Sequence, residues 1–251
     1  MARGYQHGFS ANSRAMFDQA RERKAHTMRA VIEHCLGTQM SNSTILVVGG
    51  STGIIDNYLS RHSRHVISLD IDTDAVRYAS NNFRSEQLDF IVCDGMNLAF
   101  QDNRFDIVIC SQVYEHVPDS TRLMAEIHRV LKPGGICYFA AGNRLNVIEP
   151  HYRLPFLSIM PKALAHMYLR LLRKGDQYYE THLSYWGLRH LAKAFSVTDY
   201  TLEVISNPGQ YGTEYMVAPG SMKQKLGIFL SKYCIWLVPG YIWVLRKPSN
   251  T

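Results

Sequence analysis

The chain has 251 residues, of which 46% are hydrophobic and 19% charged, and its formal net charge is +6. This length and balance suit one large α/β domain and exclude low-complexity and repetitive proteins. The positive charge is modest and spread along the chain, which is typical of solvated helix faces and disfavours a nucleic-acid-binding protein.

The cysteines and the longest apolar stretch indicate where in the cell the protein is located. Five cysteines are odd in number and none forms a Cys-x-x-Cys pair, so we expect reduced cysteines in a cytoplasmic protein and no metal site built from them. The N-terminus lacks the apolar core of a signal peptide. The longest uncharged apolar stretch, Tyr233 to Leu245, has about 13 residues, whereas a helix that spans a membrane needs roughly 20. We therefore expect no membrane-spanning helix.

The first half of the chain alternates predicted strands and helices. Helical composition over residues 12–36 predicts an N-terminal helical cap within residues 1–40. From residue 44 to 142 we expect a regular core, with strands at 45–48, 65–70, 88–93, 105–110 and 136–140. Helices are expected at 52–60, at 73–83 with Thr73 as N-cap, and from Pro118, in the first turn of the next helix. This alternation indicates right-handed βαβ units and a doubly wound, mostly parallel sheet.

The second half is less regular. We expect residues 143–183 to be a substrate-side insertion over the carboxyl edge of the sheet, with a helix at 162–174. Residues 184–251 are expected to complete the same single domain with a helix at 188–195, a strand at 197–205, a helix at 222–237 and a strand at 241–246. The two strands would form an antiparallel edge. For the apolar residues at 164–172 and 226–237 burial is the default, with a lipid-like acceptor or a membrane surface as alternatives.

The stretch Ile45-Leu-Val-Val-Gly-Gly-Ser-Thr-Gly53 is the most informative motif. Its aliphatic run predicts a buried parallel strand, and its glycines predict a tight turn into a helix beside a nucleotide-like ligand. A dinucleotide site needs Gly-x-Gly-x-x-Gly, but that register puts Ser51 second and Ile54 third. Starting one residue later fails as well, so the fingerprint of dinucleotide sites is absent.

The loop from Gly49 to Gly53 instead resembles the Gly-x-Gly-x-Gly loop of class I S-adenosylmethionine (SAM)-dependent methyltransferases. Three further stretches resemble that family in order: one ending strand two at Asp70, then 105–118, then 126–135. The likeness is strongest to quinone-biosynthesis and other small-molecule methyltransferases, and it fades after Asn143. It implies a seven-stranded sheet, SAM as cofactor, and methyl transfer to a small or lipid-like acceptor, for which we favour oxygen.

The resemblance also implies a set of cofactor-binding residues. In that family an acid ending strand two holds the ribose hydroxyls, and Asp70 matches it; two acceptor oxygens suit a vicinal diol. The acid near the adenine amine matches Asp94, and Ser111 and Gln112 would lie near the methionine end. The full set is Gly49, Gly50, Ser51, Gly53, Asp70, Ile71, Asp94, Gly95, Met96, Ser111 and Gln112.

Two positions depart from the family pattern. Val47 stands where an acid commonly organises the loop, so another group would have to substitute for it. Ser51 replaces the middle glycine, and it would still let backbone N–H groups approach a ligand if its φ stays negative. These departures leave open a second hypothesis, a non-catalytic SAM-binding partner or regulatory subunit.

Three histidines are candidate bases. Methyl transfer needs the acceptor atom within about 3–3.5 Å of the methyl carbon, and an alcohol or phenol must also lose a proton. A group that titrates near neutrality removes it best, which points to His116, His151 and His182 in that order. Glu115 beside His116 gives only two possible ligands, so we expect no metal.

The sequence leaves some other acceptors open and disfavours one class. N- or C-methylation of a natural product or glycan precursor stays an alternative to O-methylation. Nucleic-acid modification is disfavoured because no Asn/Asp-Pro-Pro-Tyr/Phe sequence follows the fourth strand. Peripheral contact with a membrane is compatible with the apolar stretches, and the sequence does not indicate an oligomeric state.

Overall fold

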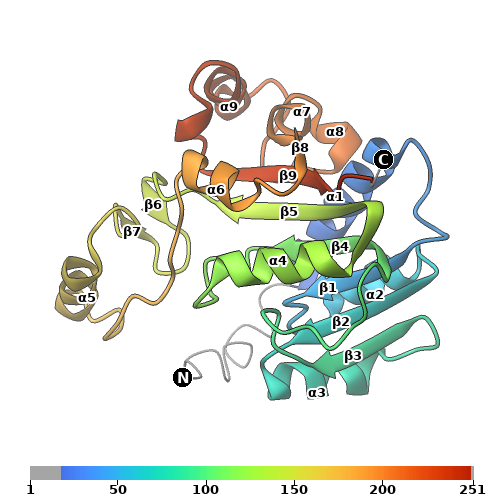
Figure 1. The fold of residues 1–251 in the computed structure, drawn as a ribbon. Helices are drawn as coiled ribbons and strands as arrows, with labels where there is room; N and C mark the ends of the chain where they lie inside the picture. Colours follow the sequence, from blue (N-terminus) through green and yellow to red (C-terminus); the bar gives the residue numbers. More distant parts are fainter. Residues whose placement is uncertain (1–17, 250–251) are drawn as a thin grey trace.

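A seven-stranded sheet forms the centre of the protein in the computed structural model, which describes residues 18–249 (Figure 1). Its spatial order is β3-β2-β1-β4-β5-β9-β8. The strands β1 to β5 run parallel, whereas β9 is antiparallel to β5 and to β8. This confirms the predicted mostly parallel, doubly wound sheet with an antiparallel edge. The strands are β1 (Thr44–Val48), β2 (His65–Asp70), β3 (Leu88–Val92), β4 (Phe105–Ser111), β5 (Leu131–Gly142), β8 (Ser196–Asp199) and β9 (Gly240–Arg246).

Helices cover both faces of the sheet because its central strands are apolar on both sides. In β1, Leu46 and Val48 pack into one core with α4 and α6, while Ile45 and Val47 pack into the other with α1 and α2. The helices are α1 (Asp18–Leu36), α2 (Ile54–Ser60), α3 (Thr73–Phe83), α4 (Ser120–Val130), α5 (Lys162–Leu171), α6 (Tyr185–Leu191), α7 (Thr201–Ser206), α8 (Pro208–Tyr211), α9 (Met222–Tyr233) and the 3₁₀ turn η2 (Ile235–Leu237).

The segment after β5 projects from the sheet at its carboxyl end (Figure 1). It contains a short hairpin of β6 (Ile148–Glu149) and β7 (Leu154–Pro155), followed by α5. A small hydrophobic cluster of its own holds it together, formed by Leu154, Leu157, Ala165, Leu169 and Tyr178. The hairpin was not predicted, since a two-residue strand leaves no periodicity to detect.

Several predicted boundaries are wrong for identifiable reasons. The N-cap of α3 is Asp72 rather than Thr73, because the Asp72 carboxylate accepts hydrogen bonds from two backbone N–H groups of the first turn. Pro118 precedes α4, which begins at Ser120 after the N-cap Asp119. The strand expected at 197–205 ends at Asp199, where its side chain accepts from the N–H of Thr201 and α7 begins.

The ends of the chain and its thiols complete the description. The expected helix start at residue 12 lies outside the described residues. Within residues 18–249, no helix has both the length and the apolar character needed to cross a bilayer. All five cysteines are free thiols, and two of them, Cys110 and Cys137, are buried in the sheet.

Candidate cofactor and acceptor sites

A cavity of about 290 Å³ opens at the carboxyl ends of β1, β2 and β4. Strand order reverses between β1 and β4, and ligands of open α/β sheets bind at such a point. Two cations of α1, Arg21 and Lys24, also line the cavity, as does His116. Ten of the eleven predicted cofactor residues line it: Gly49, Gly50, Ser51, Asp70, Ile71, Asp94, Gly95, Met96, Ser111 and Gln112.

The remaining predicted residue, Gly53, lies outside the cavity lining. It has a φ of +82° at the N-cap of α2, and an added Cβ would come within 2.9 Å of the Phe90 ring and 2.8 Å of the Ala79 Cβ. Its small size therefore lets α2 pack against α3 and β3. Gly50 has a comparable constraint inside the loop, because a Cβ there would lie 1.9 Å from the Ser68 hydroxyl.

Ser51 adopts a left-handed backbone conformation with a φ of +53°. The condition of a negative φ is not met, because the loop turns back toward β2 and the Ser51 N–H donates to Asp70 Oδ2 at 2.9 Å. A non-glycine residue in this region costs about 1 kcal/mol or more. Serine is thus tolerated in the loop at the expense of local strain.

Asp70 is fixed by two backbone donors. Its Oδ1 accepts from the N–H of Asp72 and its Oδ2 from the N–H of Ser51, each at 2.9 Å. Burial raises the pKa of the Asp70 carboxyl. Each oxygen keeps a lone pair for a further donor, so the side chain both holds the loop and can accept from a ligand diol. Asp94 is anchored likewise, with Oδ1 accepting from the N–H of Met96 at 2.9 Å.

Asp56 is a buried acid that sequence reasoning missed. It is fully buried on α2 beneath the glycine loop, and within residues 18–249 neither carboxylate oxygen has a hydrogen-bond partner of good geometry. An added Cβ on Gly50 would lie 3.0 Å from its Oδ2. Burial raises the pKa of Asp56 to about 7. The only signal in the sequence was an aspartate one turn after the loop, on the inner side of a short helix.

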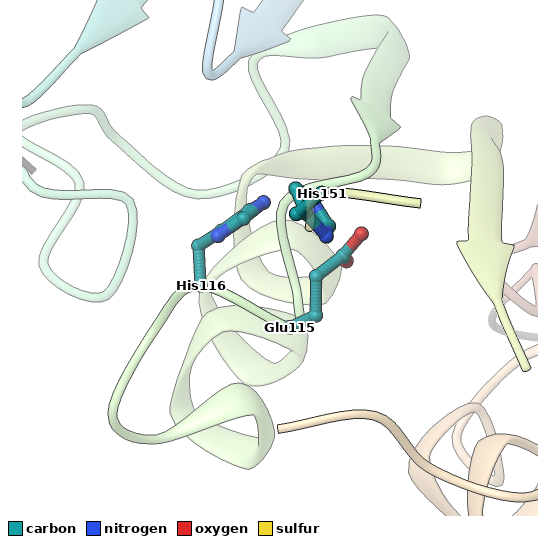
Figure 2. A group of neighbouring side chains, drawn as sticks. All are labelled: Glu115, His116 and His151. Atoms are coloured by element: carbon teal, nitrogen blue, oxygen red, sulfur yellow. The ribbon is translucent and has the colours of Figure 1, made fainter. Parts of the chain in front are cut away.

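A second group of polar side chains lies where β4 ends, beside the cavity (Figure 2). Glu115 and His116 follow β4, and the hairpin of the projecting segment brings His151 to them. The rings of His116 and His151 meet edge to face, with centroids 4.9 Å apart. His182, which precedes α6, lies 5.9 Å from His151 by the same measure. The structure thus brings the three predicted bases together, although only His116 lines the cavity.

Glu149 orients His151. Its Oε1 lies 2.6 Å from His151 Nδ1, and its Oε2 accepts from the backbone N–H groups of His151 and Tyr152 at 2.8 Å. Although burial opposes charge, the hydrogen bond and charge of Glu149 raise the pKa of His151, and the pairing with His151 lowers the pKa of the Glu149 carboxyl. A charged pair is therefore favoured, with Nε2 of His151 left for other partners.

Burial shifts the pKa values of the neighbouring acids upward and that of His182 downward. Burial raises the pKa of Glu115 to about 7, and neither of its oxygens has a hydrogen-bond partner among the described residues. Burial lowers the pKa of His182 to about 4, so its ring is neutral at pH 7. Burial also raises the pKa of Glu180, whose Oε1 lies 3.8 Å from Nδ1 of His116.

Two overlapping groups of side chains offer ligand atoms within 4.8 Å of one another. One is Glu115, His116 and His151, and the other is Glu149, His151 and His182. Imidazole nitrogen with carboxylate oxygen is a donor set that transition metals accept. Glu149 already accepts three hydrogen bonds, so a metal there would compete with them. The expected absence of a metal stays a prediction.

Residues 46–139 match the family described as "Methyltransferase domain". A ubiquinone biosynthesis O-methyltransferase of Coxiella burnetii is 27% identical over 140 residues, which cover 53% of this chain and 58% of that protein. A ubiquinone/menaquinone biosynthesis C-methyltransferase of Desulfotalea psychrophila is 33% identical over 102 residues, covering 38% of this chain and 42% of that protein.

The similarity of sequence spans about half the length of these relatives, whereas the fold extends further. A solved SAM-dependent methyltransferase of Methanosarcina mazei superposes with a TM-score of 0.53 at 18% identity, covering 86% of this chain and 98% of that one. The chain therefore shares the fold of this solved methyltransferase, and its residues 46–139 are similar to methyltransferase domains.

Proposed function

We propose that this protein transfers the methyl group of SAM to a hydroxyl oxygen of a small or lipid-like acceptor. The observation that carries the proposal is the place of His116. It lines the cofactor cavity and also contacts His151, so one residue joins the cofactor site to a group of basic side chains.

The cavity lining suits SAM residue by residue. Asp70 would accept from the two ribose hydroxyls and Asp94 would lie near the adenine amine. Ser111 and Gln112 would shape the methionine end. Arg21 and Lys24 supply positive charge on the same cavity wall, where the cofactor's carboxylate would be favoured.

The proposed reaction is an in-line displacement. The acceptor oxygen attacks the methyl carbon while the carbon–sulfur bond breaks, which gives a methyl ether and S-adenosylhomocysteine. The hydroxyl proton passes to the imidazole of His116. Glu180, whose Oε1 lies 3.8 Å from Nδ1 of His116, would stabilise the positive charge that results.

The acceptor is inferred from the segment that follows β5. Its side chains expose much apolar surface, including Phe156 at 51%, Met167 at 58% and Leu171 at 77%. The burial expected by default for residues 164–172 is therefore wrong for Met167 and Leu171. A lipid-like acceptor that packs on this segment would explain this exposure, and a cytoplasmic protein would meet such an acceptor in peripheral contact with a membrane through another surface. Because one relative is named an O-methyltransferase and another a C-methyltransferase, N- or C-methylation of a natural product or glycan precursor is the alternative.

Isothermal titration with SAM and S-adenosylhomocysteine tests the cofactor, and absence of binding to the wild-type protein would sink the proposal. The acceptor requires a second experiment, in which a cell extract is incubated with protein and isotopically labelled SAM. Mass spectrometry then identifies the compound that gains the label and the atom that carries it. Normal turnover by His116→Ala would show that positioning alone is enough and that no base acts at this residue.

A non-catalytic SAM-binding subunit is the second candidate. The specific observations that favour it are Val47 in place of the acid and the strained Ser51. It predicts cofactor binding without methyl transfer to any compound of the extract, and copurification with a catalytic protein. Transfer by the purified chain alone would exclude it.

A further inference from the structure

The helix α9 presents its large apolar side chains outward. Met222, Leu226, Phe229 and Tyr233 recur at intervals of four, three and four residues, which places them on one helical stripe. Their exposed fractions are 76%, 57%, 53% and 67%. The burial expected for residues 226–237 is thus wrong for the stripe and for Leu237, which is 46% exposed.

The inward face of α9 is more polar than its outward face. Gln224 is buried, and its side-chain amide donates to the carbonyls of Ile205 and Ser206 at 3.0 and 3.3 Å. Gly227 packs on Ile205, and Ser231 is buried as well. Since the inner side is anchored by hydrogen bonds, the helix cannot rotate to bury its apolar stripe without breaking them. The apolar stripe is therefore available to an external partner.

The apolar surface continues from α9 into the adjacent turn. Trp236 of η2 is 37% exposed and stacks on Trp186 of α6, which is 59% exposed, with ring centroids 6.2 Å apart. Figure 1 shows α9 and α6 near the end of the sheet at which β9 and β8 lie. We call the α9 stripe with Trp186, Trp236 and Leu237 the α9 surface. Tryptophan and tyrosine are the residues that favour the boundary between water and lipid.

Charge selects the kind of partner. Lys223 lies on one side of the stripe and Lys225 and Lys232 lie on the other, and all three are exposed. No aspartate or glutamate follows Glu214 in the sequence, so the last 37 residues carry only basic formal charges on their side chains. An apolar stripe flanked by lysines without acids is complementary to anionic lipid headgroups.

The α9 surface is also connected to the group of histidines at the end of β4, which we call the acceptor group (His116, His151 and His182 with the neighbouring Glu115 and Glu149). Asn143, at the end of β5, is buried and donates through its side-chain amide to the carbonyls of Trp236 and Val238 at 2.7 and 2.8 Å. One residue earlier, an added Cβ on Gly142 would lie 3.3 Å from Nε2 of His182. The η2 turn and the histidines are thus attached to the same strand end. A lipid bilayer held by this surface would therefore lie near the strand end that carries the histidines.

We propose that the α9 surface docks the protein on an anionic lipid bilayer, with the aromatic and aliphatic side chains in the headgroup region and the three lysines against the headgroups. The proposal takes its purpose from the proposed lipid-like acceptor, but docking requires no turnover. It can hold even if methyl transfer to a lipid fails.

Co-sedimentation with vesicles tests the docking. We expect the wild-type protein to bind vesicles of phosphatidylcholine mixed with phosphatidylglycerol, and to bind phosphatidylcholine alone far less. A Leu226→Gln/Phe229→Gln variant should weaken binding about tenfold or more, and so should Lys225→Gln/Lys232→Gln, since a lysine near an anionic surface contributes about fivefold. SAM titration and circular dichroism show that each variant is folded.

A matched variant on the other exposed helix separates the surfaces. Leu164→Gln/Met167→Gln removes similar apolar area from α5 and should leave vesicle binding within about twofold. Absence of binding to anionic vesicles would overturn the proposal, as would binding that depends on α5 and not on α9. A second copy of the chain is the other possible occupant, and sedimentation equilibrium tests for it. A dimer that Leu226→Gln/Phe229→Gln converts to monomer would assign the surface to that second copy.

Tryptophan fluorescence locates the contact. Trp243 is fully buried, so a blue shift or quenching by brominated lipid on vesicle addition would report Trp186 and Trp236. The Trp186→Phe/Trp236→Phe variant should lose this spectral change while it still co-sediments. An unchanged spectrum for the wild-type protein bound to vesicles would contradict the proposed orientation.

Discussion

The carboxylate of Glu149 lies 2.6 Å from Nδ1 of His151, only two residues further along the chain. The same carboxylate accepts from two backbone N–H groups of the turn, and its side chain is fully buried. This fixes the imidazole so that its other edge faces the residues that follow β4. Because the rings of His116 and His151 are in contact, a charge on one ring acts on the other.

The first prediction concerns the pH dependence of methyl transfer. Glu149 raises the pKa of His151, and a charged His151 beside His116 opposes proton transfer to His116, so turnover should rise with pH as His151 loses its proton. Glu149→Gln removes that effect, so the midpoint of kcat against pH should move to lower pH. The loss of orientation should reduce the plateau by about tenfold or more.

Glu86→Gln is the matched control, because Glu86 is exposed on the loop before β3. It should leave both the midpoint and the plateau unchanged. If the profile of Glu149→Gln keeps the wild-type midpoint, the Glu149–His151 pair has no part in the titration that limits turnover.

The second prediction concerns cofactor affinity. Asp70→Asn keeps the size of the side chain but replaces an acceptor oxygen and the charge, so we expect the Kd for SAM to rise by about 100-fold, since hydrogen bonds to a charged group contribute about 1.5–3 kcal/mol each. Isothermal titration measures this. Asp74→Asn, on the exposed side of α3, should change the Kd less than about twofold. Equal losses in the two variants would mean that charge alone, and not the position of Asp70, matters.

The third prediction addresses the strain at Ser51. With a φ of +53°, this serine should be better replaced by glycine, so Ser51→Gly should raise the free energy of unfolding by about 0.5–1 kcal/mol. Ser51→Ala keeps the strain and serves as the control. Denaturant titration of the three proteins distinguishes them, and a less stable Ser51→Gly would show that the serine hydroxyl contributes more than the backbone strain costs.

The sheet and the cofactor loop could be predicted because both leave local signals. Four aliphatic residues before Gly49 indicate a buried parallel strand, and the acid at Asp70 follows from the geometry of the neighbouring strand. The predicted end of a strand is wrong where a side chain forms a hydrogen bond that ends the strand earlier than the hydrophobic pattern indicates. The Asp199 side chain accepts from the N–H of Thr201, and α7 begins there in place of the second half of the strand expected at 197–205.

The acceptor group could be predicted only in part. Three histidines were named from their chemistry, but their meeting depends on a two-residue hairpin that sets His151 against His116. No periodicity marks so short a strand. Asp56 was missed, and burial was the default for the apolar residues of α9, for another reason: sequence spacing shows that residues share a helical face, but not which face the protein buries.

The fourth prediction concerns metal removal. Glu149 accepts three hydrogen bonds, and the raised pKa of Glu115 keeps much of that carboxyl protonated near neutrality, so neither is well suited to bind a cation. We therefore expect methyl transfer to persist in excess EDTA. Loss of turnover in EDTA, with recovery on addition of one divalent ion, would instead assign a metal to the groups that share His151.

The last prediction is a stability effect of Glu115. Its pKa is about 7 in the folded protein against 4.5 for an ordinary glutamate, so the folded state binds a proton that the unfolded state has lost between these values. The contribution of Glu115 to stability therefore falls as pH rises from about 4.5 to 7, by up to about 3 kcal/mol. Glu115→Gln should remove this loss, and its free energy of unfolding should exceed that of the wild type more at pH 8 than at pH 5.

His182→Gln provides a control of opposite sign. The folded pKa of His182 is about 4, below the ordinary 6.5, so His182 destabilises the folded protein as pH falls through this range. Urea titrations at the two pH values measure both, and a Glu115→Gln variant with the wild-type pH dependence would show that the buried carboxylate is compensated by a partner such as the charged His151.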